Sequence, residues 1–356
     1  MGINDEPVEV RKGEELDSGK VGEFIRENIG GIKGDVQVQQ FPSGFSNLTY
    51  MVKAGDRELV LRRPPFGKKA KTAHDMSREF RMLRALKPVF PYCPEALVLC
   101  EDPEVMGSPF YIMERIHGII LRRDLPNGLN LSPEQARRLS ENLIRVQCEL
   151  HSLDYRAIGL EDFGRPEGYI KRQVEGWSGR YRDARTEDAP DFEKVMGWLH
   201  AHMPEESSRP GVIHNDYKFD NVVLNPDNPL EITGVLDWEM ATIGDPLMDL
   251  GSSLAYWVQK DDPEETNLMR TMPTNLDGML TRDEQISLYR DITGYEFDNF
   301  DFYYCFGLFR LAVIAQQIYY RYFHGQTKDE RFKMLIFGVT ILEKAAIRLI
   351  KESGIS

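Results

Sequence analysis

The stretch His214-Asn215-Asp216-Tyr217-Lys218-Phe219-Asp220-Asn221 decides the fold, because it places polar groups at fixed spacing directly after an apolar run. That run, Gly211-Val212-Ile213, predicts a short strand that ends in a loop. Within the loop, His214, Asp216 and Asn221 stand at positions one, three and eight. These three side chains are therefore the first candidates for a functional site.

A hairpin is expected directly after this loop. Val222-Val223-Leu224 and residues 232–236 have the composition of strands, and the turn Asn225-Pro226-Asp227-Asn228-Pro229 joins them. The segment Leu236-Asp237-Trp238-Glu239 follows at the end of the second strand. The hairpin would therefore place Asn221 and Asp237 side by side.

This arrangement suits phosphoryl transfer from ATP to a hydroxyl group, which needs an acceptor held in line and neutralisation of the phosphate charge by Mg²⁺. In the pattern H-x-D-x-x-x-x-N, Asp216 would accept the proton of the hydroxyl and Asn221 would turn its side-chain oxygen toward the metal. Mg²⁺ prefers oxygen ligands and keeps several waters, so Asp237 is the natural second ligand. We therefore predict ATP and Mg²⁺ as cofactors.

The same residues carry a family resemblance. The chain resembles the aminoglycoside phosphotransferase and choline kinase superfamily, whose fold is similar to that of protein kinases. His214, Asp216, Asn221 and Asp237 match its catalytic loop and metal-binding motif, and Gly244-Asp245-Pro246 with Asp249-Leu250 matches the segment that follows.

Within the superfamily, the chain is most similar to the phosphotransferase-like domain associated with acyl-CoA dehydrogenases. Leu61-Arg62-Arg63-Pro64-Pro65, Leu236-Asp237-Trp238-Glu239 and Thr242-Ile243-Gly244-Asp245-Pro246 carry this likeness, which covers nearly the whole chain. The resemblance implies a functional link to an acyl-CoA dehydrogenase.

The resemblance also implies an α+β, bilobal, protein-kinase-like fold. A length of 356 residues is sufficient for two lobes. We expect an N-terminal extension or helix over residues 1–30. A small antiparallel-sheet lobe that binds nucleotide should follow over 31–114, and a larger, mainly helical lobe with the catalytic and substrate sites over 115–356.

The composition limits the classes of partner. A net charge of −13 argues against wrapping nucleic acid, because phosphate binding needs a basic face. Neither an 18-residue apolar run nor an apolar N-terminal segment is present, so we expect a cytoplasmic protein without a membrane partner. The four cysteines lack the spacing of a zinc site. A monomer and a homodimer are both compatible with these features.

The predicted nucleotide-covering loop is Pro42-Ser43-Gly44-Phe45-Ser46-Asn47, between strands expected over Val36–Gln40 and residues 49–53. The resemblance makes Ser43, Gly44, Ser46 and Asn47 candidates for contacts with phosphate oxygens. Gly44 stands alone where protein kinases carry several glycines, so an ordinary hairpin turn is the competing interpretation.

In the third strand, residues 59–62, the family places a lysine that grips the ATP phosphates, whereas this chain has Arg62 and Arg63. Period-two alternation puts Val60 and Arg62 on one face, which favours Arg62, with Arg63 as the alternative. Glu79, on a helix expected to continue to Leu86, would pair with this cation and hold it toward the phosphates. The competing interpretation of Glu79 is a solvated charge.

An apolar strand from Phe110 ends in charge before Gly118, where a kinase-like chain crosses between its lobes. Backbone groups from Glu114 to Ile116 are candidates for binding the adenine edge. An edge strand without a ligand is the alternative for the individual residues.

The rest of the chain predicts mainly helices, over residues 133–153, 192–202, 283–289, 302–323 and 331–350. The candidate catalytic residues are Asp216 and His214, and the resemblance implies that His214 packs to hold the loop while Asp216 acts as base. His151 is expected to be structural, and Asp245 to bind the backbone of the loop.

The acceptor is expected to be a small-molecule hydroxyl. An aromatic-rich segment, residues 302–323, suggests a hydroxyacyl-CoA or another lipid-derived metabolite, and Arg172, Arg180 and Arg182 around Trp177 are candidates for meeting an anionic group. Two alternatives stay open: a catalytically silent pseudokinase that binds nucleotide or acyl-CoA, and a kinase that modifies aminoglycosides.

Overall fold

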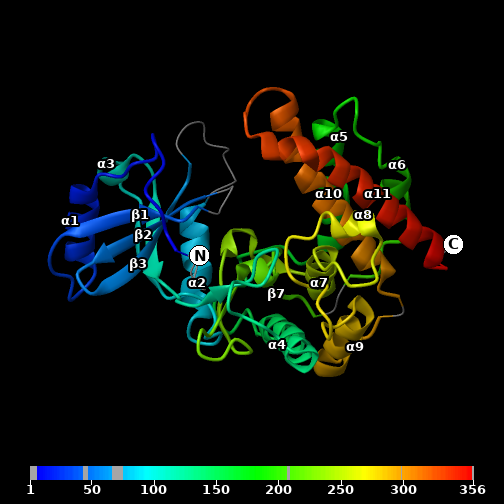
Figure 1. Cartoon of the computed structure of the whole chain (residues 1–356), viewed down its shortest axis with the longest axis horizontal. Coiled ribbons are helices and arrows are strands. Elements are labelled where there is room, and N and C mark those ends of the chain that lie inside the picture. Colours follow the sequence, from blue (N-terminus) through cyan, green and yellow to red (C-terminus); the bar gives the residue numbers. More distant parts are fainter. Residues whose placement is uncertain (1–5, 43–46, 66–74, 207–208, 298, 355–356) are drawn as a thin grey trace. The chain divides into compact units, whose positions relative to one another are not determined.

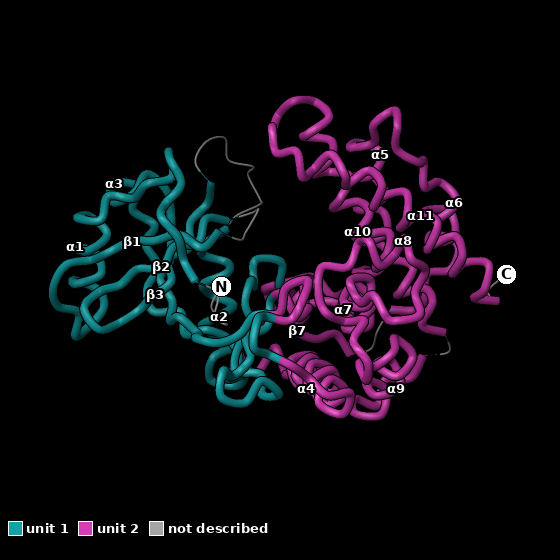
Figure 2. The backbone as a smooth tube through the Cα atoms, viewed as in Figure 1, with its two compact units in different colours: residues 1–120, 126–129, 221–241 teal, residues 121–125, 130–220, 242–356 magenta. Residues whose placement is uncertain are grey.

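The computed structural model describes residues 6–42, 47–65, 75–206, 209–297 and 299–354 (Figure 1). The chain forms two compact units, which are coloured separately in Figure 2. The first unit gathers residues 1–120, 126–129 and 221–241, and the second gathers residues 121–125, 130–220 and 242–356. The hairpin after the catalytic loop thus belongs to the first unit, although the loop before it belongs to the second. The expected lobe boundaries at residues 30 and 114 stay a prediction.

The first unit is built on an antiparallel sheet of five strands in the order β1-β2-β3-β5-β4. Its strands are β1 Val36–Gln40, β2 Leu48–Ala54, β3 Arg57–Arg63, β4 Ala96–Cys100 and β5 Phe110–Glu114. The first three strands and β5 were predicted from the sequence, and the structure confirms them. With a sheet unit and a mainly helical unit, the predicted α+β class is also confirmed.

Three helices accompany this sheet, α1 Ser18–Asn28, α2 Met76–Leu86 and the short α3 Pro103–Met106. Asp17 starts α1 by accepting the backbone N–H groups of Gly19 and Lys20, which stabilises the first turn. The apolar face of α1 buries Val21 and Ile25 in a core shared with the sheet. Burial of such side chains is the main stabilising contribution in a unit of this size.

The hairpin over β8 Val222–Leu224 and β9 Ile232–Val235 is present as predicted, and β8 also pairs with β6 Ile119–Ile120. The backbone N–H of Leu236 donates to the carbonyl oxygen of Asn221 at 2.8 Å. This bond ties the residue before β8 to the residue before Asp237. Asn221 and Asp237 are therefore neighbours, as the turn chemistry predicted.

The second unit is mainly helical. Its α-helices are α4 Pro133–His151, α5 Tyr169–Ala184, α6 Glu193–Ala201, α7 Pro246–Ala255, α8 Glu264–Asn267, α9 Arg282–Thr293, α10 Asp301–Phe323 and α11 Leu335–Glu352. A short 3₁₀ turn occupies Glu330–Met334 in this unit, another occupies Trp238–Met240 in the first unit, and a third, Phe219–Asn221, spans the change of unit. None of the helices in the described ranges is long and apolar enough to cross a bilayer.

Helix α10 is the centre of this unit. It packs against α5, α7 and α11, and α10 and α11 run side by side in Figure 1. Its aromatic side chains, Phe302, Phe306 and Phe309 among them, are buried in the largest core of the chain. The aromatic richness of this segment therefore serves packing in the first place.

Helices α7 and α10 approach each other through glycines. A Cβ atom added to Gly307 would overlap the carbonyl oxygen of Gly251, and one added to Gly251 would overlap that of Tyr303. The two backbones are therefore in direct contact at this crossing. A side chain on either glycine would force the helices apart.

A two-stranded sheet of β7 Gly211–Ile213 and β10 Thr242–Gly244 leads into the site. Helix α7 then starts at Asp245, whose Oδ1 accepts the backbone N–H groups of Leu247 at 2.8 Å and Met248 at 3.2 Å. Oδ2 is buried and has no partner among the described residues. Burial raises the pKa of this carboxyl to about 6.

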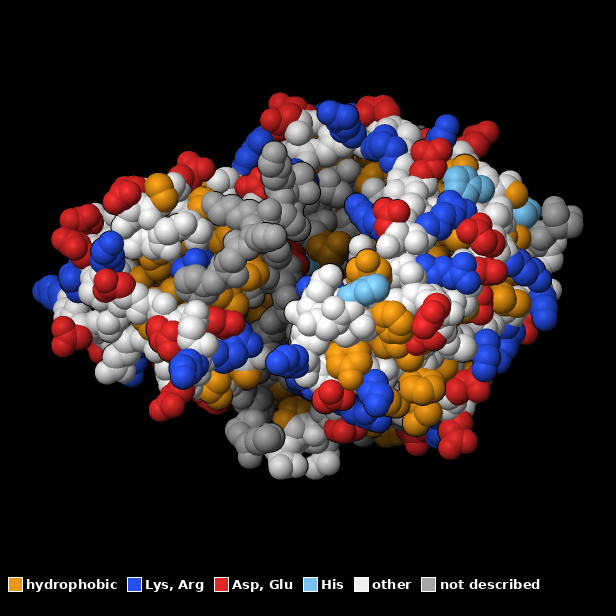
Figure 3. Space-filling view, turned by 90° about the horizontal axis from the view of Figure 1, so that it is seen from above, with side chains coloured by type: hydrophobic (Ala, Val, Ile, Leu, Met, Phe, Trp, Pro, Cys, Tyr) orange, Lys and Arg blue, Asp and Glu red, His pale blue; other side chains and the backbone are white. Residues whose placement is uncertain are grey.

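On the face drawn in Figure 3, acidic, basic and apolar side chains are interspersed. The surplus of carboxylates in the sequence is not gathered there into one acidic patch. Dispersed charge of this kind is compatible with solubility and does not identify a ligand.

The glycine crossing predicts a large effect of a single methyl group. Gly307→Ala should lower the free energy of unfolding by about 3 kcal/mol, because the backbones must separate to admit Cβ. The matched control is Gly197→Ala in α6, where nothing lies within 4 Å of an added Cβ. That control should be neutral or stabilising by up to about 1 kcal/mol. Urea unfolding followed by circular dichroism measures both; equal midpoints for the two variants would refute the close crossing.

The buried cap of α7 predicts a pH dependence. Between about pH 4 and pH 6 the folded state retains a proton on Asp245 that the unfolded state has lost, so ionisation destabilises the wild-type chain as pH rises. A pKa of about 6 instead of 3.8 corresponds to about 3 kcal/mol. Asp245→Asn keeps the accepting oxygen and removes the ionisation.

The variant should therefore gain about 3 kcal/mol relative to wild type between pH 4 and pH 7. Urea unfolding of both proteins across this range measures the difference. A constant difference across the range would contradict the assignment.

Candidate active site

The catalytic loop is held through its backbone by one buried carboxylate. Asp249 of α7 is fully buried, and its Oδ2 accepts the N–H of His214 at 3.0 Å while its Oδ1 accepts the N–H of Asn215 at 2.7 Å. Asn215 has a φ of 64°, in the left-handed region that Asn tolerates better than most residues. The two bonds hold the backbone in this conformation.

The peptide between Asn215 and Asp216 is bound at both ends. Its carbonyl oxygen accepts from Nη2 of Arg310 at 2.6 Å, and its N–H donates to Nδ1 of His214 at 3.2 Å. His214 is completely buried. This geometry supports the prediction that His214 holds the loop, and it fixes the backbone from which the Asp216 side chain projects.

A second histidine supports the buried carboxylate. Nε2 of His151 bonds to Oδ2 of Asp249 at 2.9 Å, and Nδ1 of His151 bonds to the Tyr289 hydroxyl at 2.8 Å. Burial raises the pKa of Asp249, but the hydrogen bond and charge of His151 and the N–H of His214 outweigh burial, so the pKa is lowered. Asp249 therefore stays ionised as the acceptor of the loop. The structural role expected for His151 agrees with this placement.

One expectation about this region is wrong. Asp245 was predicted to bind the loop backbone, but its carboxylate caps α7, and Asp249 binds the loop instead. The reason is geometric, because an N-cap side chain turns back toward the first N–H groups of its own helix. Asp249 lies one turn further along α7 and does not cap the helix.

The Asp216 carboxylate forms an ion pair that the sequence analysis missed. Nζ of Lys218 lies 2.7 Å from both carboxylate oxygens, and it also lies 4.4 Å from the centroid of the Tyr256 ring. Burial lowers the pKa of Lys218, but Tyr256 and Asp216 outweigh burial, so the pKa is raised and the ammonium stays charged. The spacing D-x-K in the sequence was the signal for this pair.

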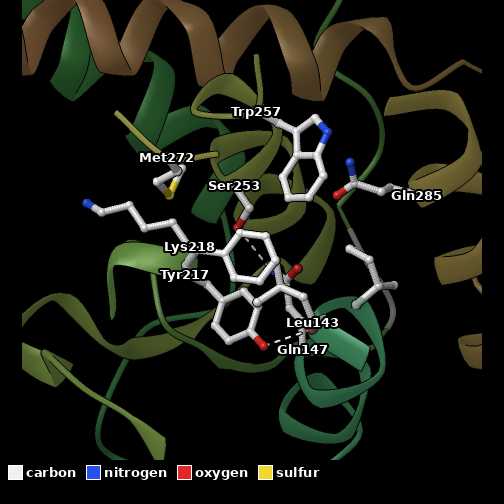
Figure 4. Close-up of a pocket in the computed structure, with 10 residues that line it drawn as sticks. Leu143, Gln147, Tyr217, Lys218, Ser253, Trp257, Met272 and Gln285 are labelled. Atoms are coloured by element: carbon white, nitrogen blue, oxygen red, sulfur yellow. Dashed lines mark hydrogen bonds between the residues drawn. The ribbon is translucent and has the colours of Figure 1, made fainter. Parts of the chain in front are cut away.

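A small cavity is lined in part by Lys218 and Tyr217 (Figure 4). Its volume of about 10 Å³ is room for roughly one water molecule. Nε2 of Gln147 donates to the Ser253 hydroxyl at 3.0 Å, whereas its Oε1 is buried without a partner in the described part of the chain. This cavity suits a buried water and is too small for an acceptor molecule.

In the first unit, Arg62 joins three carboxylates. Its Nη1 lies 2.7 Å from Glu79, and its Nη2 lies 2.8 Å from Asp237 and 3.5 Å from Glu239. Burial lowers the pKa of Arg62, but Glu79 and then Asp237 outweigh burial, so the pKa is raised and the guanidinium stays charged. The structure thus brings the predicted pair Arg62 and Glu79 together, with Glu79 only 2% exposed.

Arg63, the alternative to Arg62, points elsewhere. Its side chain donates to the carbonyl oxygens of Pro64 and Met106. The predicted pairing with Glu79 is made by Arg62, and which arginine takes the place of the phosphate-binding lysine stays a prediction.

Asp237, one of the two expected metal ligands, lies at the edge of the same cluster, and the backbone of Asn221, the other, is bonded to that of Leu236. Asp237 has a φ of 67°, and its side chain is 38% exposed. Together with the nearby Glu239, which the sequence analysis did not select, these residues supply the oxygen donors that Mg²⁺ prefers, with room for waters. The donor set therefore fits Mg²⁺.

The other predicted nucleotide contacts have mixed outcomes. Ser43, Gly44 and Ser46 lie outside the described residues. Nδ2 of Asn47 donates to Oε2 of Glu239 at 2.7 Å, so Asn47 joins the carboxylate cluster. A role of any of these residues in binding phosphate stays a prediction.

Part of the segment predicted to bind adenine forms hydrogen bonds with other residues of the protein. Oε1 of Glu114 accepts from Nζ of Lys87 at 2.6 Å and from the N–H of Glu95 at 2.8 Å. Ile116 lies against Gly234, where an added Cβ would be 2.9 Å from its side chain. Both side chains are thus structural, and binding of adenine by the backbone of this segment stays a prediction.

The predicted site residues therefore form two groups. One group in the second unit holds His214 and Asp216, and the other in the first unit holds Asn47, Arg62, Glu79, Asn221 and Asp237. The chain itself links the groups, because Asn221 follows Asp216 by five residues.

The curated proteins to which this chain is similar are longer than the chain. The chain is 37% identical to mouse acyl-CoA dehydrogenase family member 10 over 298 residues, which cover 83% of this chain and 27% of that protein. It is 30% identical to human acyl-CoA dehydrogenase family member 11, with coverage of 97% and 44%. The chain thus spans less than half the length of these two relatives, and the predicted likeness to the domain associated with acyl-CoA dehydrogenases is confirmed.

Solved structures show the same fold. A Ralstonia eutropha protein assigned to the aminoglycoside phosphotransferases superposes with a TM-score of 0.80 at 29% identity, over 95% of this chain and 99% of that one. Choline kinase from Cryptosporidium parvum superposes with a TM-score of 0.60 at 15% identity, over 94% and 96%. The second match concerns the fold alone.

A family model assigns the function class. The model described as "Phosphotransferase enzyme family" matches residues 37–270, which include the carboxylate cluster of the first unit and the catalytic loop of the second. The chain belongs to the phosphotransferase enzyme family.

Proposed function

We propose that this chain transfers the γ-phosphoryl group of ATP to a hydroxyl group of a small molecule. The observation that carries the proposal is the fixed Asn215–Asp216 peptide, which Arg310 and His214 bind at its two ends. An enzyme of this class needs little covalent chemistry, so rigid placement of the base is the main contribution that the loop can make.

Asp216 would accept the proton of the acceptor hydroxyl while the oxygen of that hydroxyl attacks the γ-phosphorus. The bond from phosphorus to the bridging oxygen of ADP breaks, and the phosphorylated alcohol and ADP are released with one proton. Nζ of Lys218, at 2.7 Å from both oxygens of Asp216, holds this carboxylate in place. Its ammonium is also a positive charge next to the position where the transferred phosphate would arrive.

In the first unit, Arg62 would bind ATP phosphates, with Glu79 holding the guanidinium in place. Asn221 and Asp237, with Glu239 beside them, would hold Mg²⁺. When bound, Mg²⁺ neutralises charge on the phosphate oxygens. A bound metal would compete with Arg62 for the carboxylate of Asp237, whose Oδ1 lies 2.8 Å from the guanidinium.

For the acceptor we propose a hydroxyacyl-CoA or a related lipid-derived alcohol. Support comes from the relatives, whose names include acyl-CoA dehydrogenase. Aminoglycosides are the alternative suggested by the match to the Ralstonia eutropha structure. Both classes present the hydroxyl group that the mechanism needs.

A second candidate function is a binding module without turnover. The contact of Arg62 with Asp237 favours it, because an arginine on the metal ligand opposes metal binding. Mg²⁺-dependent ATP binding without phosphate transfer to any acceptor would identify this function.

Replacing the base should abolish transfer and leave binding intact. Asp216→Asn should lower the rate by at least about 100-fold, because an amide cannot accept the proton. The measurement is ³¹P NMR of the protein with ATP and Mg²⁺ against hydroxyacyl-CoAs, choline-like alcohols and aminoglycosides. A new phosphoester signal in wild type and its loss in Asp216→Asn are expected.

The control for this measurement is Asp220→Asn, a carboxylate that is not part of the predicted chemistry and lies four residues further along the chain. It should keep most of the activity. A phosphoester formed equally well by Asp216→Asn would eliminate Asp216 as base, and intact ATP with every acceptor would favour the binding module.

The bridge formed by Arg62 predicts a change in the Mg²⁺ requirement. Lysine has a single ammonium group and cannot bond Glu79 and Asp237 with two separate nitrogens, so Arg62→Lys should release Asp237 for the metal. A partly exposed ion pair contributes about 1 kcal/mol, which corresponds to roughly a fivefold lower half-saturating Mg²⁺ concentration.

Titration of free Mg²⁺ at saturating ATP measures this value, by turnover or by ATP binding. Arg115→Lys is the matched control, because Arg115 pairs with Glu58 in the same unit. An unchanged or higher Mg²⁺ requirement in Arg62→Lys would contradict the proposed exchange at Asp237.

A further inference from the structure

Two arginines lie over one tryptophan in the second unit. The guanidinium carbon of Arg180, on α5, is 4.6 Å from the centroid of the Trp177 ring, and that of Arg310, on α10, is 5.1 Å from the same centroid. Trp177 is buried, so its indole is a fixed contact for each of the two cations. Partial desolvation against the ring and the charge of Arg310 lower the pKa of Arg180, in agreement with the contact of both guanidiniums with one indole.

Arg180 differs from the other arginines of its helix in its partners. Arg182 forms a two-point ion pair with Glu193, and the guanidinium of Arg172 donates to the carbonyl oxygens of Glu167 and Arg165. Within the described ranges, Arg180 has no carboxylate partner, and its side chain is exposed. Of the three arginines expected around Trp177, the structure therefore leaves Arg180 available to an anion.

Arg310, the second cation, connects the arginines around Trp177 to the catalytic loop. Arg310 is only 3% exposed, and its Nη2 holds the carbonyl oxygen of Asn215, the residue before Asp216. Two like charges in contact with one ring repel each other, and an anion bound at the exposed Arg180 would relieve that repulsion. A doubly charged phosphate group matches the two positive charges, and guanidinium groups bind phosphate with two parallel hydrogen bonds.

We propose that Arg180, with the buried charge of Arg310 behind it, binds a phosphate group carried by the acceptor alcohol. The inference rests on the proposed phosphotransferase function and narrows the acceptor to a phosphate-bearing alcohol. Arg180 contacts the phosphate, while Arg310 contributes positive electrostatic potential and positions the catalytic loop. A phosphate bound at Arg180 would therefore act, through Arg310, on the peptide that carries Asp216.

The first test does not depend on turnover. Inorganic pyrophosphate is titrated into the full chain in the presence of saturating ADP and Mg²⁺, and isothermal titration calorimetry measures binding. Arg180→Gln is compared with Arg182→Gln, which removes an exposed arginine of the same helix. The expected result is saturable binding that Arg180→Gln weakens at least tenfold and Arg182→Gln leaves unchanged. Equal binding by wild type and Arg180→Gln would overturn the proposal.

The second test uses acceptors in matched pairs. A hydroxyacyl-CoA is compared with the hydroxyacyl thioester of pantetheine, which carries no phosphate, and glycerol 3-phosphate is compared with glycerol. Arg180→Gln should raise KM at least tenfold for the phosphate-bearing member of the pair that is turned over, with kcat within twofold and no change for the other member. Equal KM values in wild type and Arg180→Gln for every phosphate-bearing acceptor would overturn the proposal.

The two tests separate the failure of this inference from the failure of the proposed function. Pyrophosphate binding that depends on Arg180, with no acceptor phosphorylated, would support the anion site and count against the phosphotransferase. Phosphorylation that needs Asp216 but is indifferent to Arg180 would support the phosphotransferase and remove the anion site.

Discussion

A carboxylate without access to water, that of Asp249, is the constraint on which the active site depends. Burying a charge is unfavourable unless it is fully paired, and here two backbone N–H groups and one imidazole satisfy it. The carboxylate can therefore be accommodated only when the catalytic loop has its observed conformation. In the same way, the left-handed backbone of Asn215 is stable only while Asp249 binds it. Loop, helix and histidine are mutually dependent, and removal of one leaves the others strained or unpaired.

The first unit uses the opposite arrangement, in which one buried cation organises several carboxylates. Arg62 lies between Glu79, which is as buried as itself, and Asp237, which faces solvent. The buried pair is permanent because separating it would leave a charge in an apolar environment. The outer pair is weak because water screens it, so it is the contact that a metal ion can displace. The Arg62 guanidinium thus forms a structural ion pair with Glu79 and an exchangeable one with Asp237.

Much of the fold followed from local patterns. The alternation in residues 59–62 favoured Arg62 as the partner of Glu79, and the proline-rich turn after Leu224 predicted that Asn221 and Asp237 would be neighbours. These predictions succeeded because strand periodicity and turn chemistry act over a few residues.

Contacts between distant segments were harder to predict. Helix α5 was missed, and the loop was assigned to Asp245 in place of Asp249, because which carboxylate reaches the loop depends on how α7 packs against β7. The network of His151, Asp249 and Tyr289 joins residues that are 98 and 138 positions apart from His151. The ion pair of Asp216 and Lys218 spans only two residues, but a lysine in a loop has many possible conformations and sequence alone does not select one.

The glycine contact between α7 and α10 has a consequence for how the protein can change over evolution. Helix α7 carries Asp249 two residues before Gly251, and α10 carries Arg310 three residues after Gly307, so the crossing fixes the spacing of both groups that hold the loop. New acceptors are therefore best accommodated by substitutions on other surfaces, such as the exposed face of α5, where side chains can vary without disturbing the base. The crossing of α7 and α10 thus fixes the groups that hold the loop, whereas the exposed face of α5 lies outside this constraint.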